Sequence, residues 1–146
     1  MSVWTHVAAT FRLDDFGNIM GYNGPIKAST WDDIFGRECP YGVDANEDER
    51  YMPTGSEGSL IRSVWTNDDE NSLFKFTVSI FWDLRDFNSY DDIERWFNES
   101  CKRVEKFGLS VRQAVCAVRV EFVDPAQKVF SYKSGECDNN NNNKEK

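Results

Sequence analysis

The sequence predicts an α+β fold of the ferredoxin-like βαββαβ type, with a four-stranded antiparallel sheet and both helices on one face. Residues 73–82 alternate between apolar and polar side chains, as a strand with one buried face does. Residues 90–107 place apolar side chains three and four positions apart, which predicts a helix with one apolar stripe. Weaker patterns supply a strand, a short helix and a strand before this pair, and a strand after it.

The first half of the chain is expected to hold the shorter elements. Residues 3–13 alternate as a strand, and Ser29 or Thr30 is suited to cap a short helix over residues 31–35. Residues 36–58 are rich in Pro, Gly and acidic residues, which predicts a long loop. Residues 60–66 alternate again, with the less clear inner face of an edge strand.

The second half begins with the strand and helix named above. Ser89 and Asp92 form a pair of the capping-box type at the start of the long helix, and Gly108 is suited to end it. The fourth strand is expected over residues 113–123, and Lys128 to Tyr132 could return as a short C-terminal hairpin strand. Residues 134–146 hold a run of Asn and charged residues, which predicts a disordered tail after a single domain over residues 1–133.

Composition favours a binding protein of the cytoplasm. The net charge of −8 argues against direct binding of nucleic acid and is compatible with a basic protein partner. The 4 cysteines form no C-x-x-C motif, so we expect neither a disulfide framework nor a metal or other cofactor. No segment approaches the roughly 20 apolar residues that span a bilayer, so we expect no membrane partner.

A partner surface is predicted around the turn that links the third strand to the long helix, where aromatic residues flank an arginine. The acidic run in the long loop is expected to add to it. Exposed carboxylates also suggest an alternative, in which they imitate a phosphate track and occupy a nucleic-acid-binding protein. The predicted partner-binding residues are Trp82, Arg85, Phe87, Asp44, Glu47, Asp48 and Glu49.

The same acidic run opens like a calcium-binding loop, with Asp44, Asn46 and Asp48 at alternate positions. The pattern then fails, because Glu49 stands where the loop needs Gly and Gly55 stands where it needs a bidentate Glu. The run is therefore interpreted as a solvated acidic loop.

A Gly/Ser-rich segment before the second strand predicts an alternative site for a nucleotide-like small molecule, which an oligomer interface could complete. The segment opens onto a strand and no Lys follows it, so it is neither a P-loop nor a dinucleotide fingerprint. The residues predicted for this ligand are Tyr51, Gly55, Ser56, Gly58, Ser59 and Arg62.

His6 is the only histidine, and no acidic residue lies at a matching offset in the sequence. It is interpreted as an ordinary strand residue, because a general base usually needs a positioned partner. An enzyme is therefore kept only as the third functional alternative. The open sheet face would carry His6, Ala8, Thr10 and Arg12 with few large rings. RNA-binding sheets combine two or three aromatics with a basic surface, so a self-pairing or protein-binding face is the better interpretation.

Several short stretches, residues 2–8, 55–59, 78–81 and 83–86, resemble small uncharacterised proteins of bacteriophage genomes. The resemblance extends over most of residues 2–100. It implies an inhibitor or sequestering protein directed at host machinery, including immune systems. The leading expectation is therefore a non-enzymatic phage-type protein that acts on a host protein by protein–protein contact, with sequestration of a nucleotide-like ligand as the alternative.

Overall fold

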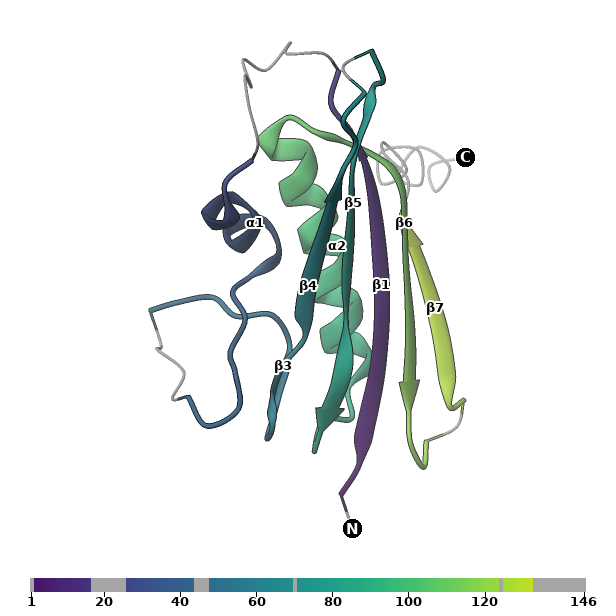
Figure 1. Cartoon of the computed structure of the whole chain (residues 1–146). Helices are drawn as coiled ribbons and strands as arrows, with labels where there is room; N and C mark the ends of the chain where they lie inside the picture. The colour runs from purple at the N-terminus through teal and green to yellow at the C-terminus, as the bar shows by residue number, and fades with distance from the viewer. Residues whose placement is uncertain (1, 17–25, 44–47, 70, 124, 133–146) are drawn as a thin grey trace, which may run out of the picture.

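The computed structural model describes residues 2–16, 26–43, 48–69, 71–123 and 125–132 (Figure 1). They form an α+β fold with two helices and a five-stranded antiparallel sheet in the order β4-β5-β1-β6-β7. The elements in chain order are β1 (Trp4–Asp14), α1 (Ala28–Phe35), β2 (Thr54–Gly55), β3 (Gly58–Ser59), β4 (Ile61–Thr66), β5 (Phe74–Arg85), α2 (Tyr90–Phe107), β6 (Ser110–Val120) and β7 (Gln127–Tyr132).

The predicted four-stranded sheet is wrong in its number of strands, because the C-terminal hairpin strand forms. β6 starts at Ser110 and ends at Val120, earlier at both ends than expected. The chain then turns through Phe122, which takes a left-handed conformation with φ of 63°. This turn brings β7 back along β6, with Gln127 paired to Arg119. The predicted tail, residues 134–146, lies outside the described residues.

The two helices differ in what stabilises them. Ser89 accepts a hydrogen bond from the Asp92 N–H and Gly108 ends α2 in the left-handed conformation, as the sequence predicts. Helix α1 starts at Ala28 and not at residue 31, and its N-cap position is Lys27, which makes no side-chain cap bond. Packing of its apolar side chains on the sheet therefore holds α1 in place.

Both helices pack on the same face of the sheet around Phe11 of β1, which is fully buried. Its ring lies 4.7 Å from the ring of Phe35 in α1 and 5.4 Å from the ring of Phe97 in α2. The Trp96 indole N–H donates to the Phe35 carbonyl at 2.8 Å, so the helices are also joined to each other. In Figure 1, α2 runs behind β5 and β1, and α1 lies beside it. We call this the covered face.

The opposite face, which we call the open face, carries the even-numbered side chains of β1. Ala8 and Thr10 of β1 are exposed there, with Phe81 of β5 and Val129 of β7 beside them in the sheet. The pairing of β1 with both neighbours is regular from Thr5 to Arg12 and shifts register only beyond Arg12, so the open-face side chains up to that point lie in rows that run across the sheet.

The segment predicted as a long loop contains some regular pairing. Arg37 and Tyr51 form an isolated parallel bridge, and β2 and β3 form a two-stranded hairpin. Strand β5 continues to Arg85, beyond the point where the sequence suggests a turn, and beyond the last residue that pairs with β4. The Ser56 N–H donates to the Arg85 carbonyl at 2.9 Å, so the hairpin contacts the end of β5.

Candidate functional sites

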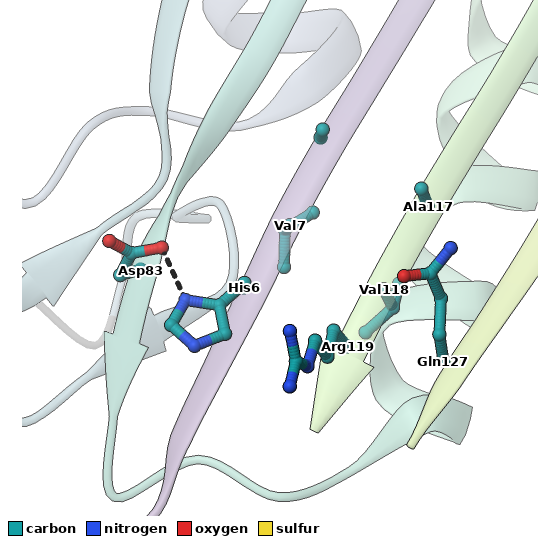
Figure 2. A pocket seen from close by; sticks show the side chains of 8 residues that line it. His6, Val7, Asp83, Ala117, Val118, Arg119 and Gln127 are labelled. Atoms are coloured by element: carbon teal, nitrogen blue, oxygen red, sulfur yellow. Dashed lines mark hydrogen bonds and ion pairs between the residues drawn. The ribbon is translucent and has the colours of Figure 1, made fainter. Parts of the chain in front are cut away.

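A hollow of about 500 Å³ lies on the open face of the sheet, and we call it the His6 hollow. Alternation places its polar side chains on the same face, and strand pairing places them in one row. Figure 2 shows His6 of β1 pointing toward Asp83 of β5, with Arg119 of β6 and Gln127 of β7 on the other side. Ala8 and Ala117 line the hollow next to this row, and their small side chains give the hollow its space.

His6 lies beside two carboxylates that come from distant positions in the sequence, where a search of nearby residues finds no acidic partner. Its Nδ1 lies 2.6 Å from Asp83 Oδ1, and its Nε2 lies 3.7 Å from Glu121 Oε1. The Asp83 contact requires a proton on Nδ1, because a carboxylate only accepts hydrogen bonds. The two residues are 77 positions apart in sequence, but they are paired directly across β1 and β5.

The His6 hollow combines an acid–base group with hydrogen-bond donors. A histidine oriented by a carboxylate is a common acid–base arrangement. Among the described residues that line this hollow, however, none carries a hydroxyl, thiol or amine that could act as a nucleophile. The described residues also include no group of three or more His, Cys, Asp or Glu placed to hold a metal ion. Arg119, Gln127 and His6 offer hydrogen-bond donors at this surface.

A second hollow, of about 250 Å³, lies beside the end of β5, and we call it the Trp82 hollow. Trp82 is paired with Val7 and so lies on the covered face, yet 49% of it is exposed. The hollow is lined there by the loop that contains Pro40 and Tyr41, and Tyr41 is 74% exposed. Ile61, the first residue of β4, also lines the hollow at this edge of the sheet, although its pairing with Phe81 places its side chain on the open face.

Two carboxylates line the Trp82 hollow. Glu38 accepts a hydrogen bond from the Arg62 backbone N–H at 2.8 Å, which fixes its position. Glu57 lies 3.4 Å from the Arg85 guanidinium in an exposed ion pair. The aromatic rings and these two acids therefore face the same hollow.

The structure does not bring the three predicted partner-binding residues of this turn together. Arg85 is paired with Trp4, which places it on the open face, whereas Trp82 lies on the covered face. Phe87 packs against the core, and its carbonyl accepts a hydrogen bond from the buried Thr5 hydroxyl. Phe87 then lines a third hollow and not the Trp82 hollow.

Of the predicted acidic run, Asp48 and Glu49 are described, and Asp44 and Glu47 lie outside the described residues. Glu49 accepts from the Arg37 guanidinium at 2.6 Å and from the Tyr51 hydroxyl at 3.0 Å. It therefore ties the two sides of the Arg37–Tyr51 bridge. The contribution of the acidic run to partner binding stays a prediction.

The Gly/Ser-rich segment makes close contacts within the protein. A Cβ on Gly55 would lie 2.4 Å from the Arg85 carbonyl oxygen, so the hairpin approaches β5 too closely for any side chain there. Gly58 has a positive φ of 111° in the β2–β3 turn. Ser56 donates to Asp86 at 2.8 Å, and the buried Ser59 hydroxyl accepts from the Cys39 N–H at 2.7 Å. These contacts place all four residues in the β2–β3 region.

The two other residues predicted for the small ligand lie apart from each other. Arg62 is directed at α1, where its guanidinium donates to Asp32 at 2.9 Å and to the Gly36 carbonyl at 3.2 Å. Tyr51 lines the third hollow. The predicted ligand residues therefore do not surround one cavity, and ligand binding by this set stays a prediction.

The third hollow, of about 250 Å³, is lined by three arginines and by two acids, Asp92 and Glu99, and we call it the arginine hollow. Arg95 and Arg103 come from α2, and Arg50 comes from the segment before β2. Arg50 and Arg103 line the same hollow, and burial and, next, the like charge of Arg50 lower the pKa of Arg103. Tyr51 and Phe87 add aromatic surface. Sequence reasoning missed this cluster, because its arginines come from separate segments.

The cysteines in the described part of the chain are buried in the core. Cys39, Cys101 and Cys116 are buried and free. Burial raises the pKa of the Cys116 thiol to about 12, and it raises the pKa of Cys101 further. Both thiols are therefore protonated at neutral pH and are not poised as nucleophiles.

No family model matches this chain, and no curated protein or solved structure matches it. No helix in the described part of the chain is long and apolar enough to cross a membrane.

Proposed function

We propose that this chain is a non-enzymatic binding protein that holds a basic segment of another protein in the Trp82 hollow. The observation that carries this proposal is a half-exposed tryptophan beside Tyr41 in a hollow that Glu38 and Glu57 also line. Tryptophan and tyrosine are the residue types that most often dominate the energy of protein interfaces. Both carboxylates would face a Lys or Arg of the partner that flanks an apolar anchor.

Charge and resemblance suggest the kind of partner. The net charge of −8 would speed association with a basic surface, and the effect would weaken as salt is added. The resemblance to small bacteriophage proteins favours a host protein as the target, including a protein of an immune system, met in the cytoplasm of the host cell.

The fold that carries the Trp82 hollow is proposed to be ferredoxin-like, with β7 as an added edge strand. Support comes from the order β4-β5-β1-β6 within the sheet and from the two helices that contact Phe11 on one face.

The test is selection of binding peptides from a random displayed library, with counter-selection against the Trp82→Ala variant. We expect enriched peptides that pair an apolar or aromatic residue with Lys or Arg. Their affinity should fall at least tenfold for Trp82→Ala, which corresponds to about 1.4 kcal/mol. Glu57→Lys should mainly slow association and reduce its dependence on salt.

The matched control is Trp65→Ala, which removes an exposed tryptophan from the open face. It should leave peptide affinity unchanged. Enriched peptides that bind Trp82→Ala as well as the original chain, or a set with no basic residues, would contradict the proposal.

A second candidate function, sequestration of a nucleotide-like ligand, is favoured by the arginine hollow. Guanidinium groups bind phosphate oxygens through paired hydrogen bonds, and aromatic rings stack on bases. Arg50, Arg95 and Arg103 with Tyr51 provide both kinds of group. Arg95 is the most suitable to test, because its side chain is 64% exposed and its ion pair with Asp92 is a surface contact.

Native mass spectrometry and thermal unfolding with AMP, GMP and inorganic phosphate test this candidate. We expect a bound nucleotide mass and a higher melting temperature, both lost in Arg95→Gln and kept in the control Arg37→Gln, whose ion pair with Glu49 lies outside the hollow. Absence of any bound mass and any shift across the panel would overturn it.

A further inference from the structure

We propose that the open face is the interface of a symmetric dimer, in which a second copy of this chain packs face to face with its two-fold axis parallel to β1. Such an axis keeps each row of side chains opposite the same row of the partner. It also exchanges the two sides of the sheet, so that β5 of one copy lies over β6 of the other. A two-fold interface must be complementary to itself, and the open face can be examined row by row for that property.

The first matching row is apolar and crosses the whole sheet. It consists of Ile61, Phe81, Ala8, Ala117 and Val129, each paired with the next. Exchange of the two sides places the large Phe81 over Ala117 of the partner and Ile61 over Val129. Ala8, on the central strand, meets its own copy. A large ring thus faces a small side chain on both sides of the axis, which is the interdigitation that packed sheets require.

The second matching row carries opposite charges on opposite sides of β1. Asp83 lies on β5 and Arg119 on β6, with His6 between them. The proposed axis places Asp83 of each copy over Arg119 of the other, so two ion pairs form across the interface. In the single chain, 41% of the His6 side chain and 59% of the Asp83 side chain are exposed.

The third matching row has the reverse order of charge. Arg85 is paired with Trp4 on the β5 side, and the Glu121 N–H donates to the Trp4 carbonyl on the β6 side. The same axis therefore places Arg85 over Glu121 of the partner. Two adjacent rows with opposite polarity both become complementary under one operation. In the single chain Arg85 lies 3.4 Å from Glu57 and donates to the Ser2 hydroxyl at 2.9 Å, so its contact with Glu121 of the partner would be shared with these exposed groups.

The other face-to-face axis lacks this match. A two-fold axis across the strands would place β5 over β5 and turn Phe81 onto its own copy. It would also place the row of Asp83 over the row of Ser79, Thr10 and Val115, where no charge is present. The charge pattern therefore selects the axis along β1.

The end of the open face at Arg12 limits how far the proposed dimer interface extends. Arg12 lies four residues from Ala8 on β1, which is about 13 Å at the rise of a strand. Its guanidinium lies 4.7 Å from the centre of the Phe74 ring, over that ring, so it is engaged within its own chain. The interface is therefore centred on Ala8 and His6, and the sheets separate toward Arg12.

The test uses two charge-reversal variants. Each should prevent dimer formation alone, and the two together should restore it. Asp83→Arg places Arg over Arg119 of a second copy, and Arg119→Asp places Asp over Asp83. Each variant alone should be monomeric in sedimentation velocity and native mass spectrometry, whereas the original chain is a dimer. An equimolar mixture should form a dimer with the sum of the two masses, because both contacts are then opposite in charge.

The controls are Asp91→Arg and Lys102→Asp, equal charge changes at exposed positions of α2, which should leave the dimer intact. A monomeric original chain at every concentration, or single variants that stay dimeric, would overturn the proposal. A mixture that stays monomeric although both variants are folded would overturn it too. A monomer that carries a small molecule lost in Arg119→Asp would assign the His6 hollow to a ligand instead. Trp82→Ala should not affect the dimer, so this proposal and the Trp82 hollow fail independently.

Discussion

The covered and open faces of the sheet are built on the same strands, yet their phenylalanines differ in burial. Phe11 is fully buried among the rings of both helices, whereas Phe81, on the adjacent strand, is 39% exposed. Alternation along a strand decides only which side chains share a face. What covers that face then decides whether a side chain stabilises the fold or is available to bind. This comparison leads to four predictions, from the largest effect to the smallest.

The largest effect is expected from Phe11→Ala, because it leaves a cavity between the sheet and both helices. We expect a loss of about 3 to 5 kcal/mol in the free energy of unfolding, measured by urea denaturation. The matched variant Phe81→Ala removes the same atoms from the open face. It should lower the stability of the monomer by under about 1 kcal/mol. Similar losses for both variants would show that the two faces are equally packed.

The next effect concerns the hairpin beside the end of β5. Gly55→Ala would force a Cβ to within 2.4 Å of the Arg85 carbonyl, so we expect a loss of about 1 to 3 kcal/mol in urea denaturation. The control is Gly42→Ala, where a Cβ would meet no atom within 4 Å and only the positive φ of 81° is strained. That strain should be about 1 kcal/mol. A smaller loss at Gly55 than at Gly42 would contradict close packing of the hairpin.

The covered face should also make stability depend on alkaline pH. Burial raises the pKa of Cys116 from 9.0 to about 12, so the unfolded chain loses this proton before the folded chain does. The stabilisation is complete below pH 9.0 and is lost as the pH rises toward about 12. Within that window the free energy of unfolding should fall by about 1.4 kcal/mol per pH unit for this thiol. Urea denaturation across the window should show a shallower fall in Cys116→Ala; an unchanged slope would refute the assignment.

The smallest effect is expected on the open face, at the His6–Asp83 pair. Asp83→Asn removes the charge next to His6, but both side chains are substantially exposed and solvent screens the pair. We expect the stability of the monomer to fall by under about 1 kcal/mol. Asp68→Asn, an exposed carboxylate in the β4–β5 connection, serves as the reference. A loss of several kcal/mol beyond that reference would show that the pair is part of the fold and not of a binding surface.

Local patterns predicted the longest elements well. Strand β5 and helix α2 have regular apolar periods, and Ser89 and Gly108 mark the ends of α2 with local hydrogen bonds and backbone conformation. Helix α1 was misplaced at its start because no cap marks it, and the sheet that buries Trp31 and Phe35 is distant in sequence. β7 was foreseen only as an option, since a strand of six residues depends on a neighbour to pair with.

The candidate sites were harder to predict because each combines distant segments. His6 and Asp83 could have been assigned to the same face from the alternation of their strands, but the register that sets them side by side has no signal in the sequence. The arginine hollow has no such signal, because Arg50 and Arg103 meet only when α2 packs beside the segment before β2. Trp82 follows the buried alternation of β5, yet it is half exposed in a hollow that the loop with Pro40 and Tyr41 also lines.

The sequence by itself determined the α+β class, the extent of β5 and α2 to within a few residues, and which side chains share each face. These properties follow from periodicity and capping, which act between near neighbours. The tertiary structure alone decided the register that sets Asp83 beside His6, the fifth strand, and the hollows around Trp82 and Arg103. Those features depend on contacts between residues far apart in the chain, where packing and not local preference sets the outcome.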